Sequence, residues 1–191
     1  NIVTEAKVLS SKLKSSHEEI LNRIYIDEKA AIVTPYHSLL NKLRELSNKN
    51  NRTGSVGSGV SEVNRIKEET GIFLTIEDLY NESYKNILRQ LFEYTTNYLK
   101  ERRHLINDKL FNKLISIDDL YYLTDEKNKD YIINCYSNLI DSDLLNIVDS
   151  INTFHKDGNI LFEGSQGLLI DRNYGIKPNT TCMDTTNKFA S

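Results

Sequence analysis

NILFEGSQGLLID, residues 159–171, is the segment that decides the fold class of this chain. Three consecutive apolar residues, 160–162, follow the turn at Asp157-Gly158 and predict a short buried strand. The strand leads into Gly-Ser-Gln-Gly, and loops with so little side-chain bulk bring backbone N–H groups close to a ligand at the carboxyl edge of a sheet. The amide of Gln166 both donates and accepts hydrogen bonds, so we expect it to recognise that ligand.

Composition limits the class of protein. The chain has 191 residues, of which 39% are hydrophobic and 27% charged, values typical of a soluble protein with a core of its own. A formal net charge of −3 argues against nucleic acid or an anionic membrane as a partner. No apolar run is long enough to span a bilayer, and residues 1–9 do not have the pattern of a signal peptide. Cys135 and Cys182 lie far apart without metal-ligand spacing, which favours reduced thiols and a cytoplasmic location.

The first 47 residues combine predicted helices with short strands. Apolar residues at helical spacing predict a helix over about residues 4–13, and Ser16-x-x-Glu19 has the pattern of a capping box before a second, short helix. Strands are predicted at residues 23–27 and 30–33. Pro35 suits the first turn of a helix over about 36–46, whose leucines face the core. We interpret His37 as a packing residue at the start of that helix and not as a ligand.

Residues 48–62 hold three of the eight glycines of the chain within six positions. One interpretation is a flexible polar linker. The other is an anion cradle, in which successive backbone N–H groups and Ser/Thr hydroxyls face a phosphate. A helix that begins near Ser61 would point its positive end at the same place. Composition alone leaves both interpretations open.

The pattern of residues 72–158 predicts a helical region of about four helices. Thr75-x-x-Asp78 has the pattern of a helix start. Apolar residues at steps of three and four then predict a long helix over about 82–105 and further helices over about 118–123, 125–140 and 141–158.

Several motifs together resemble one known family. The family text of adenylosuccinate synthetases, FEGAQG, LLD, G-x-x-P and SSNTT, is matched in order and spacing by FEGSQG (162–167), LLID (168–171), Gly175, Pro178 and Asp184-Thr185-Thr186. Pro35-Tyr36-His37 matches a further family motif. The resemblance implies an α/β fold, namely the central part of a P-loop-like synthetase fold with a large helical insertion. It divides the chain into 1–71 with the glycine-rich phosphate loop at 48–62, the helical insertion 72–158, and a core strand plus nucleotide-binding loop at 159–191.

The resemblance also implies which residues bind the substrate nucleotide. Gln166 falls on the glutamine that touches the purine base, and Thr181 falls on the threonine that holds the 5′-phosphate. The loop that grips the same phosphate falls on Thr53, Gly54, Ser55, Val56 and Gly57. The sequence departs from the family where a phosphate-binding threonine is Val56, an arginine is Ser58, and the Asn of SSNTT is Asp184.

The implied activity is that of a carbon–nitrogen ligase in purine biosynthesis. It joins L-aspartate to the 6-position of IMP at the expense of GTP, or ATP, with Mg²⁺, and the family is usually a homodimer. The GDEGKG and GGHNAGHT segments that carry the catalytic Asp and His of the family are not in these 191 residues, so we name no catalytic and no metal-binding residue. The chain does not begin with Met, and we expect it to be the central part of a larger enzyme.

Three alternatives follow from the same residues. The Gly-Ser-x-Gly-x-Gly text is closer to archaeal members and to phage enzymes that act on dGMP to make 2-aminoadenine nucleotides, so a 2-aminoadenylosuccinate synthetase is the second candidate. The departures at Val56, Ser58 and Asp184 allow a non-catalytic homologue that binds nucleotide or serves as an interaction module. An unrelated helical regulatory domain requires that both glycine loops match by chance.

Overall fold

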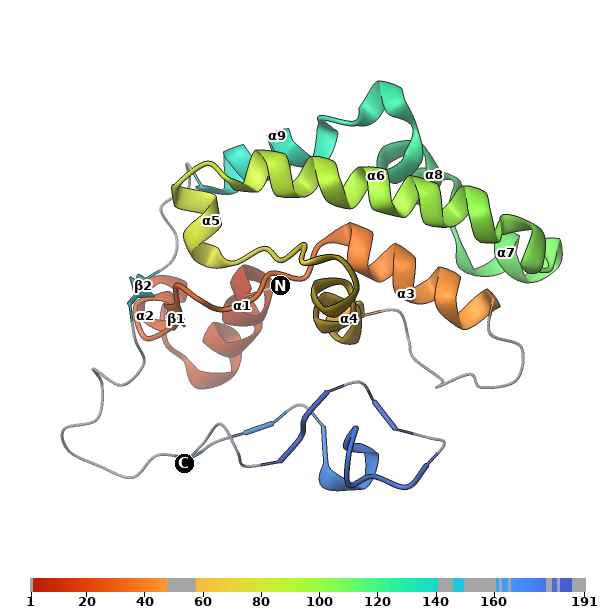
Figure 1. Cartoon of the computed structure of the whole chain (residues 1–191). Coiled ribbons are helices and arrows are strands. Elements are labelled where there is room, and N and C mark those ends of the chain that lie inside the picture. Colours follow the sequence, from red (N-terminus) through yellow and green to blue (C-terminus); the bar gives the residue numbers. More distant parts are fainter. Residues whose placement is uncertain are drawn as a thin grey trace.

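The structure, a computed structural model, describes residues 2–47, 58–140, 146–149, 161, 163–164, 166–177, 180–181 and 183–186. This part of the chain is mostly helical and contains one small parallel sheet (Figure 1). The helices are α1 (Ile2–Leu13), α2 (His17–Leu21), α3 (Pro35–Ser47), α4 (Val60–Thr70), α5 (Ile76–Tyr80), α6 (Tyr84–Arg102), α7 (Asp108–Leu114), α8 (Ile117–Thr124) and α9 (Tyr131–Ile140). The strands are β1 (Tyr25–Asp27) and β2 (Asn146–Val148), and short 3-10 turns occur at 103–105, 126–128 and 168–170.

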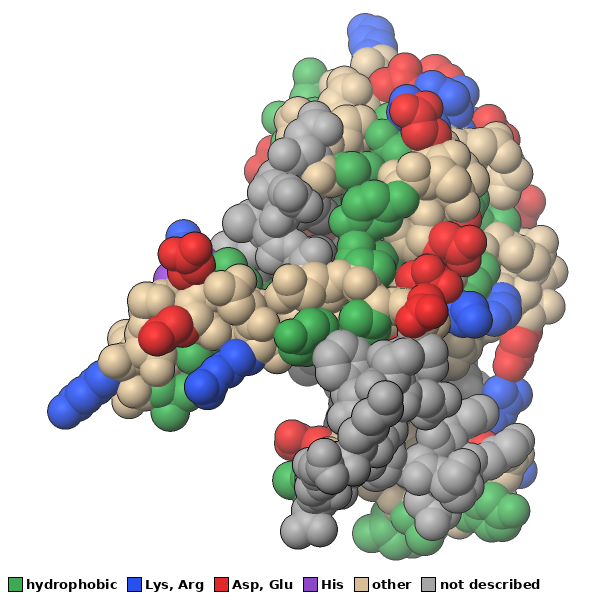
Figure 2. Space-filling model, turned by 90° about the vertical axis from the view of Figure 1, so that its left-hand side faces the viewer, with side chains coloured by type: hydrophobic (Ala, Val, Ile, Leu, Met, Phe, Trp, Pro, Cys, Tyr) green, Lys and Arg blue, Asp and Glu red, His purple; other side chains and the backbone are tan. Residues whose placement is uncertain are grey.

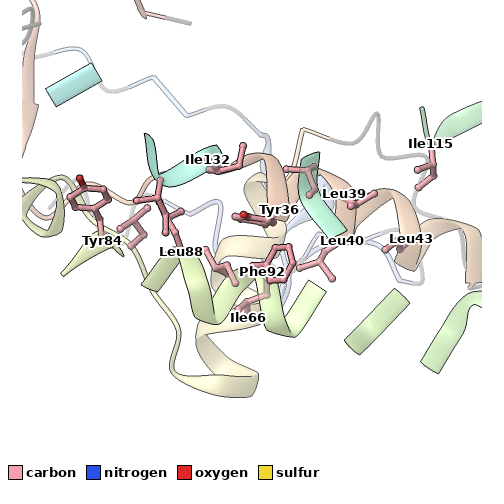
Figure 3. Close-up of a cluster of buried hydrophobic side chains, with 14 of the residues drawn as sticks. Tyr36, Leu39, Leu40, Leu43, Ile66, Tyr84, Leu88, Phe92, Ile115 and Ile132 are labelled. Atoms are coloured by element: carbon pink, nitrogen blue, oxygen red, sulfur yellow. The ribbon is translucent and has the colours of Figure 1, made fainter. Parts of the chain in front are cut away.

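The main hydrophobic core lies between α3 and α6, which run side by side in Figure 1. The two helices meet where the Tyr36 and Phe92 rings pack edge to face, with centroids 6.4 Å apart. Helices α4, α7, α8 and α9 complete the core from their apolar faces, because each is amphipathic and buries one stripe. Figure 3 shows these side chains pointing toward one another: Tyr36, Leu39, Leu40, Leu43, Ile66, Tyr84, Leu88, Phe92, Ile115 and Ile132.

Local sequence signals explain where several helices begin. The predicted capping boxes at Ser16 and Thr75 are confirmed, since each side chain accepts from the backbone three residues on and the acidic residue there accepts in return. Helix α3 begins at Pro35 as predicted, because proline lacks only an N–H that the first turn leaves unused. Gly71 ends α4 in the left-handed conformation, with φ of 77°.

The prediction of a helix over 141–158 is wrong at residues 146–148. These residues form β2, which pairs in parallel with β1 so that Ile147 lies opposite Ile26. The β-branched pair Ile147-Val148 suits a strand, and the neighbouring strand β1 decides between the two conformations. This pairing joins residues near the start of the chain to residues beyond α9, whereas the division at 72 and 158 stays a prediction.

The structure differs from the predictions made from the sequence at three further places. The second predicted strand, 30–33, is reduced to one antiparallel bridge between Ala31 and Thr75. Helix α7 was not predicted, although Asn107 caps it by accepting from two backbone N–H groups. Leu161 belongs to the predicted buried strand, yet its side chain is 92% exposed and it lies outside any strand. Its neighbours at 160 and 162 lie outside the described residues.

The surface carries mixed charge. Figure 2 shows Lys/Arg and Asp/Glu side chains interspersed on one face, with hydrophobic side chains gathered in a band between them. Helix α1 forms as predicted, but its apolar residues Val8, Leu9 and Leu13 are exposed, whereas Ala6 is fully buried. Within the described ranges, every helix is too short or too polar to cross a bilayer.

Candidate functional site

The N-terminal ends of α3 and α4 meet at Ser58-Gly59. The hydroxyl of Ser38 donates to the carbonyl of Ser58 at 3.2 Å. Gly59 precedes α4 with φ of 80°, and a Cβ at this position would lie 2.7 Å from the backbone N of Ser38. Only glycine allows this close approach in the left-handed conformation. Helix α4 begins at Val60, one residue before the predicted start, and its positive end lies beside that of α3.

An open cavity of about 550 Å³ lies at this junction. It is lined by Val33, Thr34, Pro35, Ser38, Leu39, Lys42, Ser58, Val60 and Asp119. Hydroxyl groups, the ammonium group of Lys42 and two helix N-termini suit a small anion such as a phosphate. The ammonium group of Lys42 also pairs with Asp119, whose Oδ2 lies 3.0 Å from Lys42 Nζ. Only part of the charge of Lys42 is therefore available to a ligand.

His37 is part of the scaffold behind this cavity. It is 1% exposed, and its Nδ1 accepts the backbone N–H of Thr34 at 3.0 Å, as the acid of a capping box does. Burial lowers the pKa of His37 to about 4, so the ring is neutral at pH 7. These contacts agree with the interpretation of His37 as a packing residue with a hydrogen bond at the start of α3.

A second group of residues surrounds the carboxylate of Asp171. Its Oδ1 accepts the backbone N–H groups of Asn173 at 2.7 Å and Tyr174 at 2.9 Å. Its Oδ2 accepts both the N–H and the hydroxyl of Thr185, at 2.6 and 3.3 Å. These donors stabilise the ionised form and lower the pKa of Asp171 to about 2. Asp171 therefore holds together two loops, one with Gln166 and one with Thr181 to Thr186.

Gln166 and Thr181 both lie on this Asp171-centred unit. The Oε1 atom of Gln166 is buried and has no hydrogen-bond partner among the described residues. Thr181 is fixed by its backbone, which donates to the carbonyl of Ile170 at 2.7 Å, and its hydroxyl accepts from Met183 N. No hydrogen bond among the described residues joins the two side chains. A buried carbonyl without a donor is costly, so Gln166 is suited to a ligand that supplies an N–H.

Helix α4 connects the cavity to the Asp171-centred unit. Asn64 Nδ2 lies 3.0 Å from the sulfur of Met183, and Glu68 pairs with Arg172 at 2.8 Å. In Figure 1 the segment with residues 166–186 accordingly runs along the side of α4 that faces away from α6. The predicted phosphate residues Thr53, Gly54, Ser55, Val56 and Gly57 lie outside the described residues. They directly precede Ser58, which lines the cavity.

Sequence reasoning missed two polar clusters. Asp171 ends the LLID motif, but its four donors come from residues up to fourteen positions away, so the motif does not indicate its role. Arg44 and Glu62 form an ion pair of 2.8 Å between α3 and α4 that no sequence motif predicts. A charged residue at a buried helical position was the available clue, since Glu62 lies one position before the core residue Val63.

Comparison with known proteins identifies the family of this chain. A sequence model of the adenylosuccinate synthetase family matches residues 1–191. This chain belongs to the adenylosuccinate synthetase family. The family assignment confirms the resemblance that the FEGSQG and Asp184-Thr185-Thr186 motifs indicate, and the fold is compatible with an α/β segment of such a protein.

Similar proteins named adenylosuccinate synthetase come from several bacteria. The protein of Microcystis aeruginosa is 31% identical over 94% of this chain and 37% of its own length. That of Wigglesworthia glossinidia brevipalpis is 29% identical over 97% of this chain and 42% of its own length. That of Tolumonas auensis is 26% identical over 92% of this chain and 37% of its own length. The chain thus spans less than half of the length of these relatives.

A synthetase of this family implies Mg²⁺ and a nucleoside triphosphate. Among the described residues, no group of three or more His, Cys, Asp or Glu side chains is arranged to hold a metal ion.

Proposed function

We propose that this chain supplies the purine nucleotide contacts of an adenylosuccinate synthetase. The reaction is the ligation of L-aspartate to the 6-position of IMP in purine nucleotide biosynthesis, with hydrolysis of GTP and with Mg²⁺. The protein works in the cytoplasm as a homodimer, without nucleic acid or membrane partners. The observation that carries the proposal is the buried Oε1 of Gln166, which has no hydrogen-bond partner among the described residues and lies on a loop that Asp171 fixes beside Thr181.

Each named residue has a distinct role in this proposal. The Gln166 amide accepts an N–H of the purine base through Oε1 and orients the 6-oxo group. The Thr181 hydroxyl donates to the 5′-phosphate, and the glycine segment Thr53 to Gly57 adds backbone N–H groups. The junction of the α3 and α4 N-termini provides positive potential for the same anion.

The reaction balances in two steps. A base takes the N1 proton of IMP, and the 6-oxo oxygen attacks the γ-phosphorus of GTP. A C6–O–P bond forms, the bond between the γ-phosphorus and the β–γ bridging oxygen breaks, and GDP leaves. The amino nitrogen of aspartate then attacks C6, loses a proton, and displaces inorganic phosphate. Gln166 and Thr181 act by binding and orientation, which accelerates both steps by holding C6 in place. The base and the metal that the chemistry demands are assigned to no residue of this chain.

Binding of IMP by calorimetry tests the nucleotide site directly. We expect the wild-type chain to bind IMP, and Gln166→Ala or Thr181→Ala to weaken binding about tenfold or more, because each loses a hydrogen bond to the ligand. Gln90→Ala is the matched control, since Gln90 is an exposed glutamine on α6. Equal weakening by all three variants, or no binding of any purine monophosphate, contradicts the proposal.

Measurements of turnover distinguish the synthetase from the 2-aminoadenylosuccinate synthetase and from the non-catalytic homologue. Phosphate release with IMP, aspartate, GTP and Mg²⁺ supports the synthetase, and replacement of GTP by ATP identifies the donor. Preference for dGMP over IMP supports the 2-aminoadenylosuccinate synthetase. Nucleotide binding without turnover by the full-length protein supports the non-catalytic homologue.

A further inference from the structure

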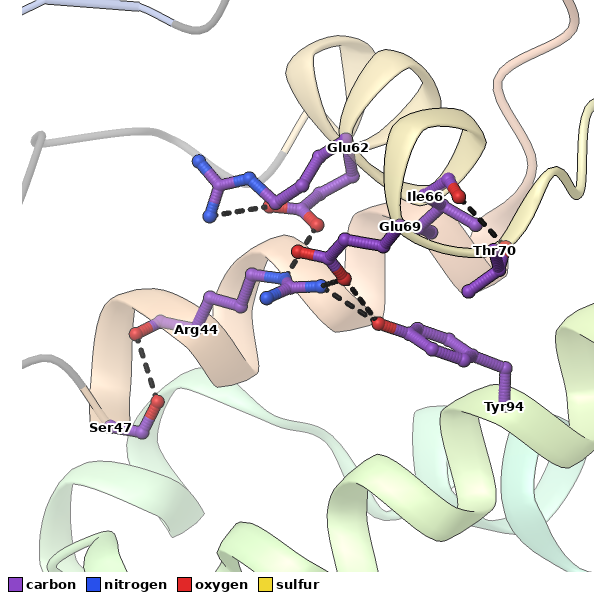
Figure 4. A network of polar contacts seen from close by, with 8 residues as sticks. Arg44, Ser47, Glu62, Ile66, Glu69, Thr70 and Tyr94 are labelled. Atoms are coloured by element: carbon purple, nitrogen blue, oxygen red, sulfur yellow. Dashed lines mark hydrogen bonds and ion pairs between the residues drawn. The ribbon is translucent and has the colours of Figure 1, made fainter.

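A polar cluster with one buried carboxylate, that of Glu62, links α3, α4 and α6. Arg44 of α3 donates through Nε to Glu62 at 2.8 Å, and through Nη2 to Glu69 at 2.7 Å and to the hydroxyl of Tyr94 at 2.9 Å. Tyr94 in turn donates to Glu69 at 2.6 Å. Figure 4 shows the guanidinium of Arg44 between the two carboxylates of α4 and the phenol of α6. The guanidinium also lies over the ring of Tyr98, 4.8 Å from its centroid.

A contribution to the stability of the fold is a weak explanation for the presence of this cluster. Glu62 is 1% exposed, and its burial removes water from a carboxylate at a cost that the ion pair offsets only in part. Replacement of buried ion pairs by apolar residues is often neutral or stabilising, whereas loss of one partner is strongly destabilising. What a planar guanidinium with several fixed partners supplies is one defined arrangement of the helices around it.

The position of the pair points to the nucleotide site. Glu62 is the third residue of α4, and α4 follows directly on Ser58-Gly59, which contacts the N-terminus of α3. Arg44 lies in the last turn of α3, which ends at Ser47. The ion pair thus joins the two helices on either side of residues 48–59.

Helix α4 is held from two sides. Glu62 and Glu69 bind Arg44 on the core side, while Asn64 and Glu68 contact the segment with residues 166–186. A rotation of α4 about its axis would therefore move Ser58-Gly59 at its start and the residues around Met183 at its side together.

We propose that Arg44 and Glu62 are positioning residues for nucleotide binding: they set the rotation of α4, and through it the geometry of Ser58-Gly59 and of the Asp171-centred unit. This inference rests on the proposed function, to which it adds two residues that touch no ligand. The pair acts on affinity for the nucleotide and not on the stability of the fold.

The double variant Arg44→Met/Glu62→Leu tests this separation. We expect its thermal midpoint to equal or exceed that of the wild type, while its affinity for IMP falls about tenfold. Glu62→Gln keeps an acceptor for Arg44 Nε and is expected to bind IMP within about threefold of the wild type. Arg89→Met/Asp130→Leu is the matched control, because it removes an exposed ion pair of 3.3 Å between α6 and the turn before α9 and is expected to leave affinity unchanged.

Hydrogen exchange supplies a second readout that does not depend on any ligand. In the double variant we expect faster exchange of the backbone N–H groups at 59–64 and 181–186, and unchanged exchange in α6. Unchanged exchange at both sites, or full IMP affinity in the double variant, overturns the positioning role. If the double variant does not fold, Arg44→Lys carries the same test, since a lysine keeps the charge but cannot hold both carboxylates and Tyr94.

Wild-type binding distinguishes the two proposals. If the wild type does not bind IMP, the proposed function fails, and the exchange data still decide whether Arg44 and Glu62 position α4. If the wild type binds IMP and the double variant binds equally well, the proposed function stands and the positioning role fails.

Discussion

The backbone N–H of Thr185 donates to Asp171 Oδ2 at 2.6 Å and joins residues fourteen positions apart. The Thr185 hydroxyl also donates to the carbonyl of Gly167 at 3.1 Å, next to Gln166. One carboxylate and one threonine thus connect the loop with Gln166 to the segment with Thr181 and Thr185. Loops of this kind need such internal bonds, because they have no ladder of a sheet or helix to fix them.

The first prediction concerns the pKa of Asp171. Its backbone and hydroxyl donors lower that pKa to about 2, against about 3.9 in an unfolded chain. The group therefore contributes stability that is complete above about pH 4 and is lost as the pH falls toward about 2. Carboxyl-carbon NMR between about pH 6 and pH 3 should show Asp171 still ionised when exposed aspartates are largely protonated. A midpoint near about 3.9, the value of an aspartate in an unfolded chain, would contradict the hydrogen-bonded arrangement.

The second prediction concerns the phenol of Tyr36. Its ring is fully buried against Phe92, and its hydroxyl has no hydrogen-bond partner among the described residues. Burial raises its pKa, so the hydroxyl stays protonated. We expect Tyr36→Phe to be neutral or stabilising, because it removes an unsatisfied polar group, whereas Tyr36→Ala should cost about 3–5 kcal/mol through the cavity that it leaves. Urea unfolding measures both, and a clear loss in Tyr36→Phe would reveal a partner for the hydroxyl.

Local signals predicted several of the helices, whereas the strand pairing depends on long-range contacts. The stripe on α6 and the capping boxes at Ser16 and Thr75 depend on residues three or four positions apart, so the sequence alone identifies them. The strand at Asn146–Val148 depends on Tyr25–Asp27, more than a hundred positions away, and the apolar spacing there favoured a helix. Leu161 shows the same limit, because an apolar run predicts burial only when another element covers it.

The residues of the candidate site likewise fall into those that a local motif identifies and those that only long-range contacts reveal. Gln166 and Thr181 are identified by motif text, since their neighbours in sequence carry the resemblance. Asp171 and the pair Arg44 and Glu62 act by accepting or donating across the fold, and no short motif contains both partners. The structure therefore adds Asp171, Arg44 and Glu62 to the residues that the sequence identifies, because their partners lie far away in the sequence.

The third prediction is a pH dependence of stability due to His37. Burial lowers its pKa from about 6.5 in the unfolded chain to about 4, so the unfolded state takes up the proton first. Stability due to this group is complete above about pH 7 and declines as the pH falls from about 6.5 to about 4, by roughly 3 kcal/mol in all. His37→Asn keeps an acceptor for the Thr34 N–H but does not titrate.

Comparison of the wild type with His37→Asn isolates the contribution of His37 to the pH dependence of stability. Denaturant midpoints measured from about pH 7 to pH 4 should converge, with the wild type losing stability faster than His37→Asn. Other titrating groups are common to both and cancel in the difference. A constant difference across this range would mean that His37 is protonated as easily in the folded chain as in the unfolded one.

The fourth prediction uses two glycines with almost the same backbone conformation. Gly59 has φ of 80° and Gly71 has φ of 77°, so alanine at either position pays the cost of the left-handed region, about 1–2 kcal/mol. At Gly71 a Cβ meets no atom within 4 Å, whereas at Gly59 it would lie 2.7 Å from Ser38 N and 2.8 Å from His37 C. Backbone atoms of a helix cannot move aside, so α4 itself must shift.

Gly71→Ala is therefore the control for Gly59→Ala. We expect Gly59→Ala to lower the unfolding free energy by at least about 1 kcal/mol more than Gly71→Ala, because overpacking is added to the conformational cost. Gly59→Ala should also weaken IMP binding, since the junction of α3 and α4 lines the cavity, while Gly71→Ala at the far end of α4 should leave binding unchanged. Equal losses of stability in the two variants would show that Ser58-Gly59 does not pack against the N-terminus of α3.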